Sequence, residues 1–375
     1  MTRLVALDLG GGDSFVSHLV DVWSAGDAVL PLDQRLSRAD KSSLLEALGA
    51  HEVIDASGWT ALTTGRSLES DDALVIATSG STGAPKGVVH THASIAASSR
   101  ASLARLDGSS ADHWLACLPL AHIGGFSVIT RALASGSKLT VRPAADPGTI
   151  AAAVGAGCNR TSLVPTLLHR IDVSAFETVL IGGGRPPVDR PPNVVATYGL
   201  SETGSGVVYD GWALDDVELS IGNDDEILIR GAMLMRAYRD GTTSVDEDGW
   251  LHTRDAGSID ASGKLSVTGR LDDLIKTGGE KVWPEQVERL LDELYSDRTS
   301  CVVGVPDAEW GESVVLVTDR AGLDLDEVRG RIKDRLPARF APKHIVVADV
   351  PRTTNGKIRR ADVRVIAERA LTIAD

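Results

Sequence analysis

Short apolar runs alternate with helix-like patterns along most of the chain, separated by polar or glycine-rich breaks. Strand-type runs occur in "DAVLPLD", "DDALVIATSG", "WLACLPL", "KLTVRP", "ETVLIGGG" and "NVVATYGL". Helix-type patterns occur in "KSSLLEALGA", in the alanine-rich segment 93–106 and in "GTIAAAVGAG". Because alternating strands and helices pack as layers, this order predicts an α/β domain whose ligand-binding loops lie at strand ends.

The pattern changes near residue 270. The segment 284–294, "PEQVERLLDEL", has apolar residues on one face and Pro284 in its first turn, which predicts a helix. The strand-type runs "CVVGV", "SVVLVTD" and "HIVVAD" and the helical pattern "DLDEVRGRIKDRL" follow. We therefore predict a large layered α/β domain over residues 1–271 and a small α+β domain over residues 272–375.

Composition and charge narrow the possible functions. The chain has 375 residues and a net charge of −14, which makes it a poor candidate for general nucleic-acid binding, since phosphate contacts need a basic face. An anionic ligand must therefore be held by local Lys and Arg side chains and by backbone N–H groups. The N-terminal apolar run is short and broken by Asp8, unlike a signal peptide, and no apolar stretch is long enough to span a bilayer.

The three cysteines lie far apart in the sequence and have no metal-ligand spacing. We interpret Cys117, Cys158 and Cys301 as reduced core residues of a cytoplasmic protein, with a catalytic cysteine as the weaker alternative.

The stretch "TSGSTGAPKG" (78–87) combines three glycines, one proline, four hydroxyl side chains and one lysine. Its glycines allow backbone N–H groups to converge, and Lys86 adds a positive charge, which is typical of a phosphate-binding loop. It is not a Walker A loop, since Pro85 precedes the lysine and Gly87 follows it. We expect the loop to connect a strand to the helix at 93–106. On composition alone, a flexible exposed loop is the alternative.

Two further glycine-rich stretches follow predicted strands. In "TYGLSETGSG" (197–206), Glu202 lies among hydroxyl residues, as suits Mg²⁺, and Tyr198 can stack on a base. The alternative is an N-capped turn with a surface glutamate. In "IGGGRPP" (181–187), three glycines allow a flat ring to approach the backbone, although this signal is weak by itself.

Three charged residues complete the candidate chemistry. Asp255 in "LHTRDAG" can accept hydrogen bonds from both hydroxyls of a ribose, and Arg270 follows fifteen residues later. A structural ion pair is the alternative for either residue. Lys357 in "TTNGKIRR" follows an Asn-Gly turn that can project it from a hairpin tip, with a solvated basic turn as the alternative.

The order and spacing of these stretches resemble the adenylate-forming superfamily, which includes acyl-CoA synthetases, adenylation domains of peptide synthetases and luciferases. The matching segments are "TSGSTGAPKG", "YGLSETG", "TRDAG", "GRLDDLIKTGGEKVWPEQVE" and "PRTTNGKIRR". The resemblance extends from about residue 70 to the end of the chain. It implies an AMP-forming ligase: ATP and a carboxylate give an acyl-adenylate and pyrophosphate, and a thiol, usually coenzyme A, then displaces AMP.

The resemblance also implies roles for individual residues. Those implied to bind the ATP phosphates are Thr78, Ser79, Gly80, Ser81, Thr82, Gly83 and Lys86. Those implied to frame the adenine are Gly182, Gly183, Gly184, Tyr198 and Gly199. Mg²⁺ is assigned to Glu202 and Thr82, the α-phosphate to Thr203, and the ribose to Asp255 and Arg270.

In the second part of the chain, the resemblance makes Lys357 the catalytic residue that bridges the carboxylate and the α-phosphate. Asp272 becomes the hinge of the small domain. The segment 276–282, with Lys276, Gly278 and Gly279, is implied to reach the active site for thioester formation.

Within the superfamily, the sequence looks most like the short, actinobacterial-type o-succinylbenzoate–CoA ligases of menaquinone biosynthesis. "LPLAHIGGF" resembles an acyl-pocket segment with a gating His122, and "TSLVPTLLHR" resembles the helix before the adenine strand. Candidates for binding the second carboxylate of such a substrate are Arg131, Arg185 and Arg190. Another acyl- or aryl-CoA ligase, or a non-catalytic nucleotide-binding relative, remains an alternative, and a homodimer is expected from the family.

Overall fold

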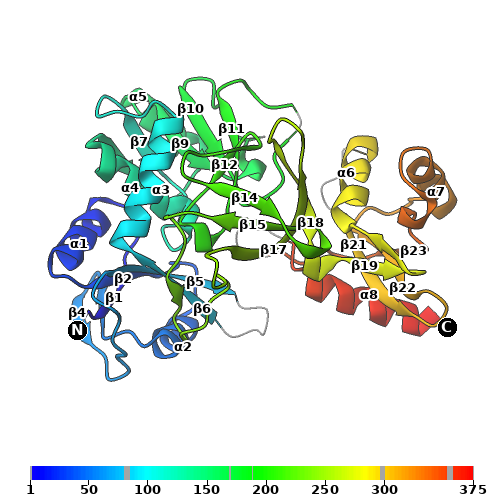
Figure 1. Cartoon of the computed structure of the whole chain (residues 1–375), viewed down its shortest axis with the longest axis horizontal. Helices are drawn as coiled ribbons and strands as arrows, with labels where there is room; N and C mark the ends of the chain where they lie inside the picture. Colours follow the sequence, from blue (N-terminus) through cyan, green and yellow to red (C-terminus); the bar gives the residue numbers. More distant parts are fainter. Residues whose placement is uncertain are drawn as a thin grey trace. The chain divides into compact units, whose positions relative to one another are not determined.

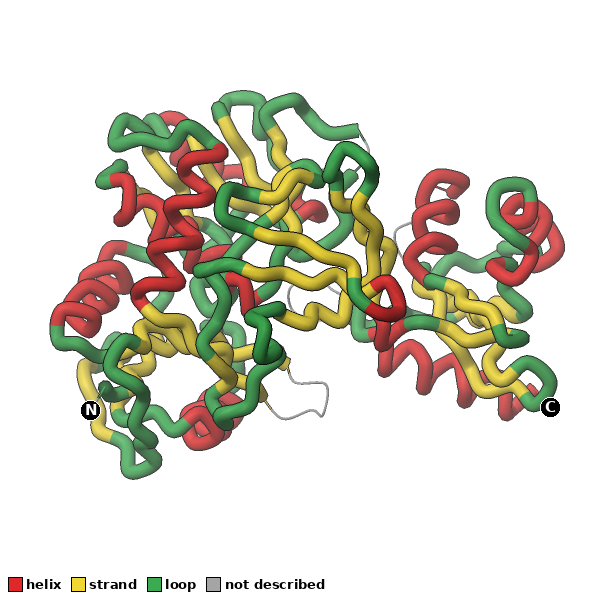
Figure 2. Tube along the Cα trace, in the orientation of Figure 1, coloured by secondary structure: helices red, strands yellow, loops and turns green. Residues whose placement is uncertain are grey.

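The computed structural model describes residues 2–79, 85–168, 170–187, 189–295, 300–352 and 358–374. Figures 1 and 2 show the path of the chain and its secondary structure. By its internal contacts the chain divides into two compact units. Unit 1 comprises Met1–Leu219, Leu228–His252 and Gly263–Leu265, and unit 2 comprises Ser220–Ile227, Thr253–Ser262 and Ser266–Asp375.

The first sheet of unit 1 has seven strands. In spatial order they are β16 (Ala237–Tyr238), β6 (Pro85–Thr91), β5 (Asp72–Ser79), β2 (Ala28–Pro31), β1 (Leu4–Asp8), β3 (Glu52–Asp55) and β4 (Gly58–Ala61). Strand β1 pairs in parallel with β2 and β3, and helices α1 (Asp13–Ser24) and α2 (Arg38–Leu48) lie between these strands in sequence. Gly49 caps the C-terminus of helix α2, and its φ of 66° is the left-handed conformation that glycine adopts without strain.

The predicted connection of the loop at 78–87 to a helix is wrong. Residues Pro85–Thr91 form strand β6, which pairs antiparallel with β5, so the loop joins two neighbouring strands. Helix α3 (His92–Arg105) begins after it, capped by Thr91. The β-branched residues Val88 and Val89 are fully buried opposite Ile76 and Val75, and this cross-strand packing explains the extra strand.

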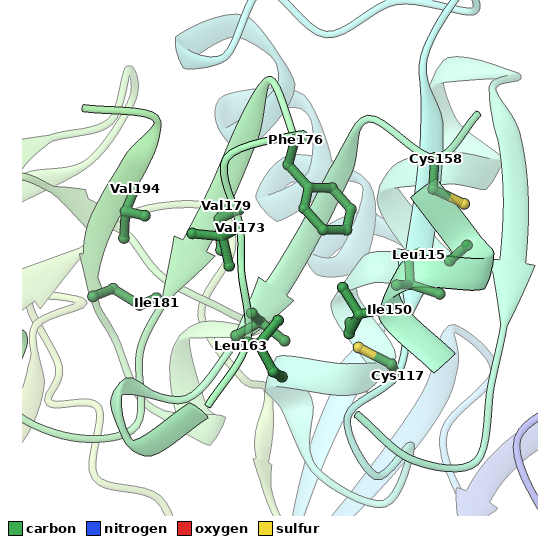
Figure 3. Close-up of a cluster of buried hydrophobic side chains, with 12 residues drawn as sticks. Leu115, Cys117, Ile150, Cys158, Leu163, Val173, Phe176, Val179, Ile181 and Val194 are labelled. Carbon is green, nitrogen blue, oxygen red and sulfur yellow. The ribbon is translucent and has the colours of Figure 1, made fainter. Parts of the chain in front are cut away.

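The second sheet of unit 1 also has seven strands and contains the predicted parallel core. In spatial order they are β13 (Trp212–Ala213), β12 (Val208–Tyr209), β11 (Val194–Tyr198), β10 (Thr178–Ile181), β9 (Arg160–Leu163), β7 (His113–Ala116) and β8 (Lys138–Val141). The five strands from β11 to β8 pair in parallel. Figure 3 shows side chains from β7, β9, β10, β11 and helix α5 (Pro147–Gly155) gathered in one buried cluster.

One local expectation in this region is wrong, and one helix was not predicted. The segment "TSLVPTLLHR" was expected to be helical, but it contains the end of strand β9 and only a short 3-10 turn at Pro165–Leu167. Conversely, helix α4 (Ile123–Ser135) forms despite Gly124 and Gly125 in its first turn. A Cβ atom at Gly125 would lie 2.5 Å from the Pro119 carbonyl oxygen, so close packing requires glycine there.

A third sheet has four strands in the order β14 (Glu218–Ile221), β15 (Glu226–Arg230), β17 (Leu251–Ile259) and β18 (Leu265–Arg270). Its strands β17 and β18 carry Asp255 and Arg270, respectively.

Unit 2 contains the predicted α+β pattern. Its five-stranded sheet has the order β20 (Glu280–Val282), β19 (Ile275–Thr277), β22 (Gly311–Thr318) and β21 (Cys301–Asp307), with β23 (His344–Val347) also paired to β22. The helices are α6 (Pro284–Tyr295), α7 (Leu325–Lys333) and α8 (Arg360–Ala374). The apolar face of α6 is buried as predicted, since Val287, Leu290 and Leu291 belong to the core.

The three cysteines are free and buried, as the sequence predicted. Burial raises the pKa of the Cys117 thiol to about 11 and that of the Cys301 thiol to about 12, so neither is a reactive thiolate at neutral pH. Across the described ranges, no helix has the length and apolar character needed to cross a bilayer.

Candidate active site

The flanks of the glycine-rich loop face each other at the ends of β5 and β6. Thr78 lies opposite Lys86 in the antiparallel ladder, and its hydroxyl donates to the Lys86 carbonyl at 3.3 Å. A Cβ atom at Gly87 would lie 2.8 Å from Val75 and 2.9 Å from Leu48, so the base of the loop packs closely. The backbone of Ser79 belongs to β5, whereas Gly80, Ser81, Thr82 and Gly83 lie outside the described residues.

Glu202 lies in the 3-10 turn Ser201–Thr203 and contacts a residue that the motif analysis missed. The Tyr238 hydroxyl donates to Glu202 Oε1 at 2.9 Å. The Lys86 Nζ atom lies 4.8 Å from the centroid of the same tyrosine ring. Residues from three separate segments of unit 1 therefore place a carboxylate and an ammonium group around one phenol. In the sequence, Tyr238 stands in "MRAYRDG", which carries no distinctive signal.

The Tyr238 hydroxyl remains protonated over the physiological range. Burial, followed by the charge of Glu202, raises the pKa of Tyr238 to about 12. The phenol can therefore act as a donor to the carboxylate, which in its ionised form only accepts hydrogen bonds.

Hydrogen bonds from buried side chains fix the turn that contains Glu202. The Thr203 side chain is fully buried, and its hydroxyl accepts from Leu200 N at 2.8 Å and contacts the Ser205 carbonyl at 2.7 Å. The predicted role of Thr203 toward the α-phosphate would therefore compete with contacts inside the turn. His90 Nε2 donates to the Ser201 carbonyl at 2.7 Å, which ties β6 to this turn. Complete burial lowers the pKa of His90 to about 4, so its imidazole is neutral.

The glycines predicted to frame the adenine have identifiable packing reasons. A Cβ atom at Gly182 would lie 2.6 Å from Thr197 Oγ1, and one at Gly199 would lie 2.2 Å from the Ser205 carbonyl oxygen. Gly183 has a φ of 73°, which favours glycine, whereas Gly184 has more room. Tyr198 is the last residue of β11 and is partly exposed.

His122 lies immediately before helix α4, next to a charged pair that sequence reasoning did not single out. Its Nε2 atom lies 3.1 Å from the Arg35 guanidinium and 3.5 Å from the Asp33 carboxylate. Arg35 and Asp33 form an ion pair at 2.6 Å. Because arginine can only donate, the imidazole nitrogen that faces Arg35 acts as an acceptor there.

The three arginines considered for a second substrate carboxylate have different surroundings. Arg131 is only 3% exposed, donates to Ser102 Oγ at 2.8 Å and lies over the Trp114 ring, which makes it a core residue. Arg190 pairs with Asp210 and donates to the Val194 carbonyl. Arg185 is exposed.

In unit 2, the two predicted ribose-binding residues contact each other. Arg270 lies 3.0 Å from Asp255, whose side chain is 10% exposed. Arg254, directly before Asp255, has a φ of 61° within strand β17, which is unusual for a residue with a side chain. Its guanidinium lies 2.8 Å from Asp272, the predicted hinge residue, and Arg270 lies 3.7 Å from the same carboxylate.

Gly278 and Gly279 form the two-residue turn between β19 and β20, where Thr277 pairs with Glu280. Their φ values of 59° and 78° match the turn type that favours glycine at both positions. A Cβ atom at Gly278 would lie 2.9 Å from the Trp310 ring, and the Gly278 N–H donates to the Trp310 carbonyl at 2.9 Å. The Lys276 N–H donates to Glu312 at 2.8 Å.

Lys357 lies outside the described residues, but the chain on both sides of its segment is described. Arg352 and Ile358 form an antiparallel bridge, and the Arg359 N–H donates to the Pro351 carbonyl at 2.9 Å. Helix α8 begins at Arg360, which lies among Asp273, Glu285 and Glu288.

The described residues contain no group of three or more His, Cys, Asp or Glu side chains that could hold a metal ion by themselves. A single glutamate nevertheless suits Mg²⁺ that arrives with a nucleotide, because Mg²⁺ often binds one or two carboxylates together with substrate phosphates and waters. Glu202 fits this donor set, whereas Thr82 lies outside the described residues.

Comparisons with known proteins agree with this arrangement. A family model described as "AMP-binding enzyme" matches residues 17–239, and "AMP-binding enzyme C-terminal domain" matches residues 287–357. A Mycobacterium tuberculosis protein named "Probable 2-succinylbenzoate--CoA ligase" is 36% identical over 91% of this chain and 96% of its own length. An Amycolatopsis protein named "Feruloyl-CoA synthase" is 29% identical over 94% of this chain and 86% of its own length.

Solved structures share the fold. Wild-type E. coli MenE, with a bound m-phenylether-linked analogue of OSB-AMS, superposes with a TM-score of 0.78 at 27% identity. The match covers 98% of this chain and 88% of that chain.

The layered α/β unit, the glycine-rich loop between two of its strands and the small α+β unit together define the adenylate-forming fold, as predicted. The chain belongs to the AMP-binding enzyme family. Enzymes of this family use ATP and Mg²⁺, and its acyl-CoA ligases also use coenzyme A.

Proposed function

We propose that this protein is an ATP-dependent acid–thiol ligase that converts 2-succinylbenzoate to 2-succinylbenzoyl-CoA in menaquinone biosynthesis. The observation that supports this substrate assignment is the near full-length match to the M. tuberculosis protein named "Probable 2-succinylbenzoate--CoA ligase". The match covers 91% of this chain and is therefore much longer than the nucleotide motifs alone.

The first half-reaction forms an acyl-adenylate. A carboxylate oxygen of the substrate attacks the α-phosphorus of ATP, the bond to the bridging oxygen breaks, and pyrophosphate leaves with the electron pair. The loop at 78–87 and Lys86 would bind the departing pyrophosphate through backbone N–H groups, hydroxyls and one cation. Lys357 would stabilise the charge that develops between the carboxylate and the α-phosphate.

Glu202 would hold Mg²⁺, which when bound neutralises phosphate charge during the displacement. Thr82 is the second proposed ligand. The adenine would lie against Gly182, Gly183, Gly184, Tyr198 and Gly199.

Residues of unit 2 would bind the ribose and serve the second half-reaction. Asp255 is a nearly buried acceptor that pairs with Arg270, and its carboxylate would accept hydrogen bonds from the ribose hydroxyls. Asp272 would act as the hinge about which the small domain rotates between the two half-reactions. The segment with Lys276, Gly278 and Gly279 would then assist attack of the coenzyme A thiolate on the acyl carbon, with release of AMP.

The acyl group would enter near His122, which we propose as the gating residue. Arg35, in contact with this imidazole, adds a cation close to the segment and suits a substrate that carries a second carboxylate. Because Arg131 is buried among core residues, it is less suited to that role than an exposed arginine.

The assignment is tested with purified protein, ATP, Mg²⁺, coenzyme A and a panel of carboxylic acids. We expect AMP, pyrophosphate and a thioester to form with 2-succinylbenzoate at a higher kcat/KM than with any other acid. If a fatty acid or a simple aryl acid is used and 2-succinylbenzoate is not, the substrate assignment is wrong.

A second candidate is an aryl-CoA ligase with a different acid, which the similarity to a protein named feruloyl-CoA synthase favours. The same panel, with ferulate included, separates the two. A non-catalytic nucleotide-binding relative is less consistent with a sequence that retains Lys86, Glu202, Asp255 and Lys357 together.

We also propose that the enzyme acts in the cytoplasm as a homodimer and without a nucleic-acid partner. Light scattering coupled to size-exclusion chromatography measures the mass directly. A mass of one chain at all concentrations would exclude the dimer.

A further inference from the structure

Tyr238 connects two candidate ligands of ATP that lie far apart in the sequence. It is the last residue of strand β16, which pairs antiparallel with β6 through Ala237–Val89 and Tyr238–Val88. This pairing places the tyrosine beside the strand that begins just before Lys86. Its ring lies 4.8 Å from the Lys86 ammonium, and its hydroxyl donates to Glu202 at 2.9 Å.

The same short segment also fixes the backbone of Glu202. The Met235 N–H donates to the Glu202 carbonyl at 2.8 Å. The glutamate is therefore held by two hydrogen bonds from residues 235–238, one to its main chain and one to its side chain. A carboxylate that accepts a fixed phenol bond has fewer orientations available, and such supporting contacts commonly tune metal affinity.

The Lys86 ammonium is restricted by the other part of the tyrosine. A cation near the face of an aromatic ring is attracted by the negative face of that ring. The hydroxyl thus acts on the carboxylate, and the ring acts on the ammonium. The two effects can be separated, because phenylalanine keeps the ring and lacks the hydroxyl.

We propose that Tyr238 is a positioning residue for nucleotide binding, which orients the Glu202 carboxylate through its hydroxyl and the Lys86 ammonium through its ring. This inference rests on the proposed function, in which Glu202 binds Mg²⁺ and Lys86 binds phosphate. It adds a residue that is not itself assigned to the metal or the phosphate and that acts through Glu202 and Lys86, the two residues that would bind them.

The test uses three variants of the full-length protein: Tyr238→Phe, Tyr238→Leu and Ser244→Ala. The last is a matched control, since Ser244 Oγ lies 3.1 Å from the Tyr238 hydroxyl and the substitution leaves the Glu202 contact in place. Calorimetric titration with ATP, with and without Mg²⁺, gives a readout that does not depend on turnover. Thermal unfolding of each variant reports whether the fold is kept.

We expect Tyr238→Phe to lose about tenfold in the Mg²⁺-dependent gain of ATP affinity while it keeps the Mg²⁺-free affinity. Tyr238→Leu should show the same loss and, in addition, bind Mg²⁺-free ATP about threefold more weakly, because the ring is gone. For Ser244→Ala, the Mg²⁺-free ATP affinity and its Mg²⁺-dependent gain should both stay within about twofold of the wild type.

Unchanged Mg²⁺-dependent binding in a folded Tyr238→Phe protein would overturn the proposal. Equal losses in Tyr238→Phe and Ser244→Ala would also overturn it, since they would indicate general loosening of the turn. Because Tyr238→Phe differs by one hydroxyl, the test does not depend on whether Tyr238→Leu folds. If the wild type itself binds ATP without any Mg²⁺ effect, the assigned role of Glu202 fails, and the Tyr238 proposal fails with it. Failure of the 2-succinylbenzoate panel with normal Mg²⁺-dependent binding affects only the substrate.

Discussion

The Arg360 guanidinium lies 2.6 Å from the Glu288 carboxylate, and both side chains are largely buried in unit 2. The same guanidinium lies 3.2 Å from Asp273 and 3.5 Å from Glu285, and it donates to the Val302 carbonyl. One cation therefore balances three carboxylates. Since α8 begins at Arg360, the contact with Asp273 ties the start of this helix to the residue after the proposed hinge.

Replacing Arg360 by methionine should destabilise unit 2 strongly, because three neighbouring carboxylates would lose their shared cation. Removing one partner of a buried pair typically costs about 3–5 kcal/mol in the free energy of unfolding. The control is Arg364→Met in the same helix. The Arg364 side chain is 45% exposed and pairs with Glu312 and Glu368, so its replacement should lower the free energy of unfolding by less than about 1 kcal/mol. Urea unfolding, together with hydrogen exchange of the α8 amides, measures the stability loss of each variant. Equal effects would contradict the buried-cluster interpretation.

Glu285 makes the stability of unit 2 depend on pH. Burial raises the pKa of its carboxyl from 4.5 to about 7, even though Arg360 opposes this shift. Between these values the folded protein binds more protons than the unfolded chain, so this carboxyl lowers the free energy of unfolding as the pH rises. The effect is at most about 3 kcal/mol.

The measurement is the difference in free energy of unfolding between the wild type and Glu285→Gln from pH 5 to pH 8. We expect the wild type to lose stability relative to the glutamine variant as the pH increases. The difference cancels contributions from other titrating groups, such as His90, whose lowered pKa removes stability below about pH 6.5. A difference that does not change with pH would show that Glu285 does not titrate in this range.

The motifs indicated candidate binding and reacting residues, but they did not indicate the residues that support them. Lys86, Glu202 and Asp255 belong to short local patterns whose residue types already indicate phosphate, metal or ribose. Tyr238 and Arg360 gain their importance from contacts 36 and 72 residues away in the sequence, and no local pattern encodes such pairs. Local sequence patterns therefore indicate candidate chemical groups but not the side chains that hold these groups in place.

The fold was predicted to a similar extent. Strongly periodic segments such as α6 appear where the apolar pattern placed them. Strand β6 was missed because its four buried residues are too short a run to separate from the following helix by periodicity alone. Helix α4 was missed because Gly124 and Gly125 oppose helix formation locally, and tertiary packing at Gly125 outweighs that preference.

Arg254 should carry backbone strain that glycine would relieve. Its φ of 61° costs a residue with a side chain about 1 kcal/mol relative to glycine. Both side chains of its ion pair with Asp272 are more than half exposed, so the pair contributes little to the free energy of unfolding. We therefore expect Arg254→Gly to be about 1 kcal/mol more stable than Arg254→Ala in thermal or urea unfolding. Equal stability of the two variants would contradict the left-handed conformation at this position.

Lys357→Ala should separate the two half-reactions. If Lys357 stabilises charge only in adenylation, its loss should reduce acyl-adenylate formation by about 100-fold or more. Thioester formation from preformed acyl-adenylate and coenzyme A should be nearly unaffected. Rapid-quench measurement of each half-reaction provides the test, with Arg359→Ala as a neighbouring cationic control. Equal losses in both half-reactions would remove the assigned role.

The most direct test of the account is pyrophosphate–ATP exchange. Labelled pyrophosphate is incubated with the enzyme, ATP, Mg²⁺ and 2-succinylbenzoate in the absence of coenzyme A. Because adenylation is reversible and takes place before the thiol reacts, we expect label in ATP that depends on 2-succinylbenzoate and disappears when the acid is omitted. Absence of acid-dependent exchange, or formation of ADP and phosphate in place of AMP, would contradict an acyl-adenylate mechanism.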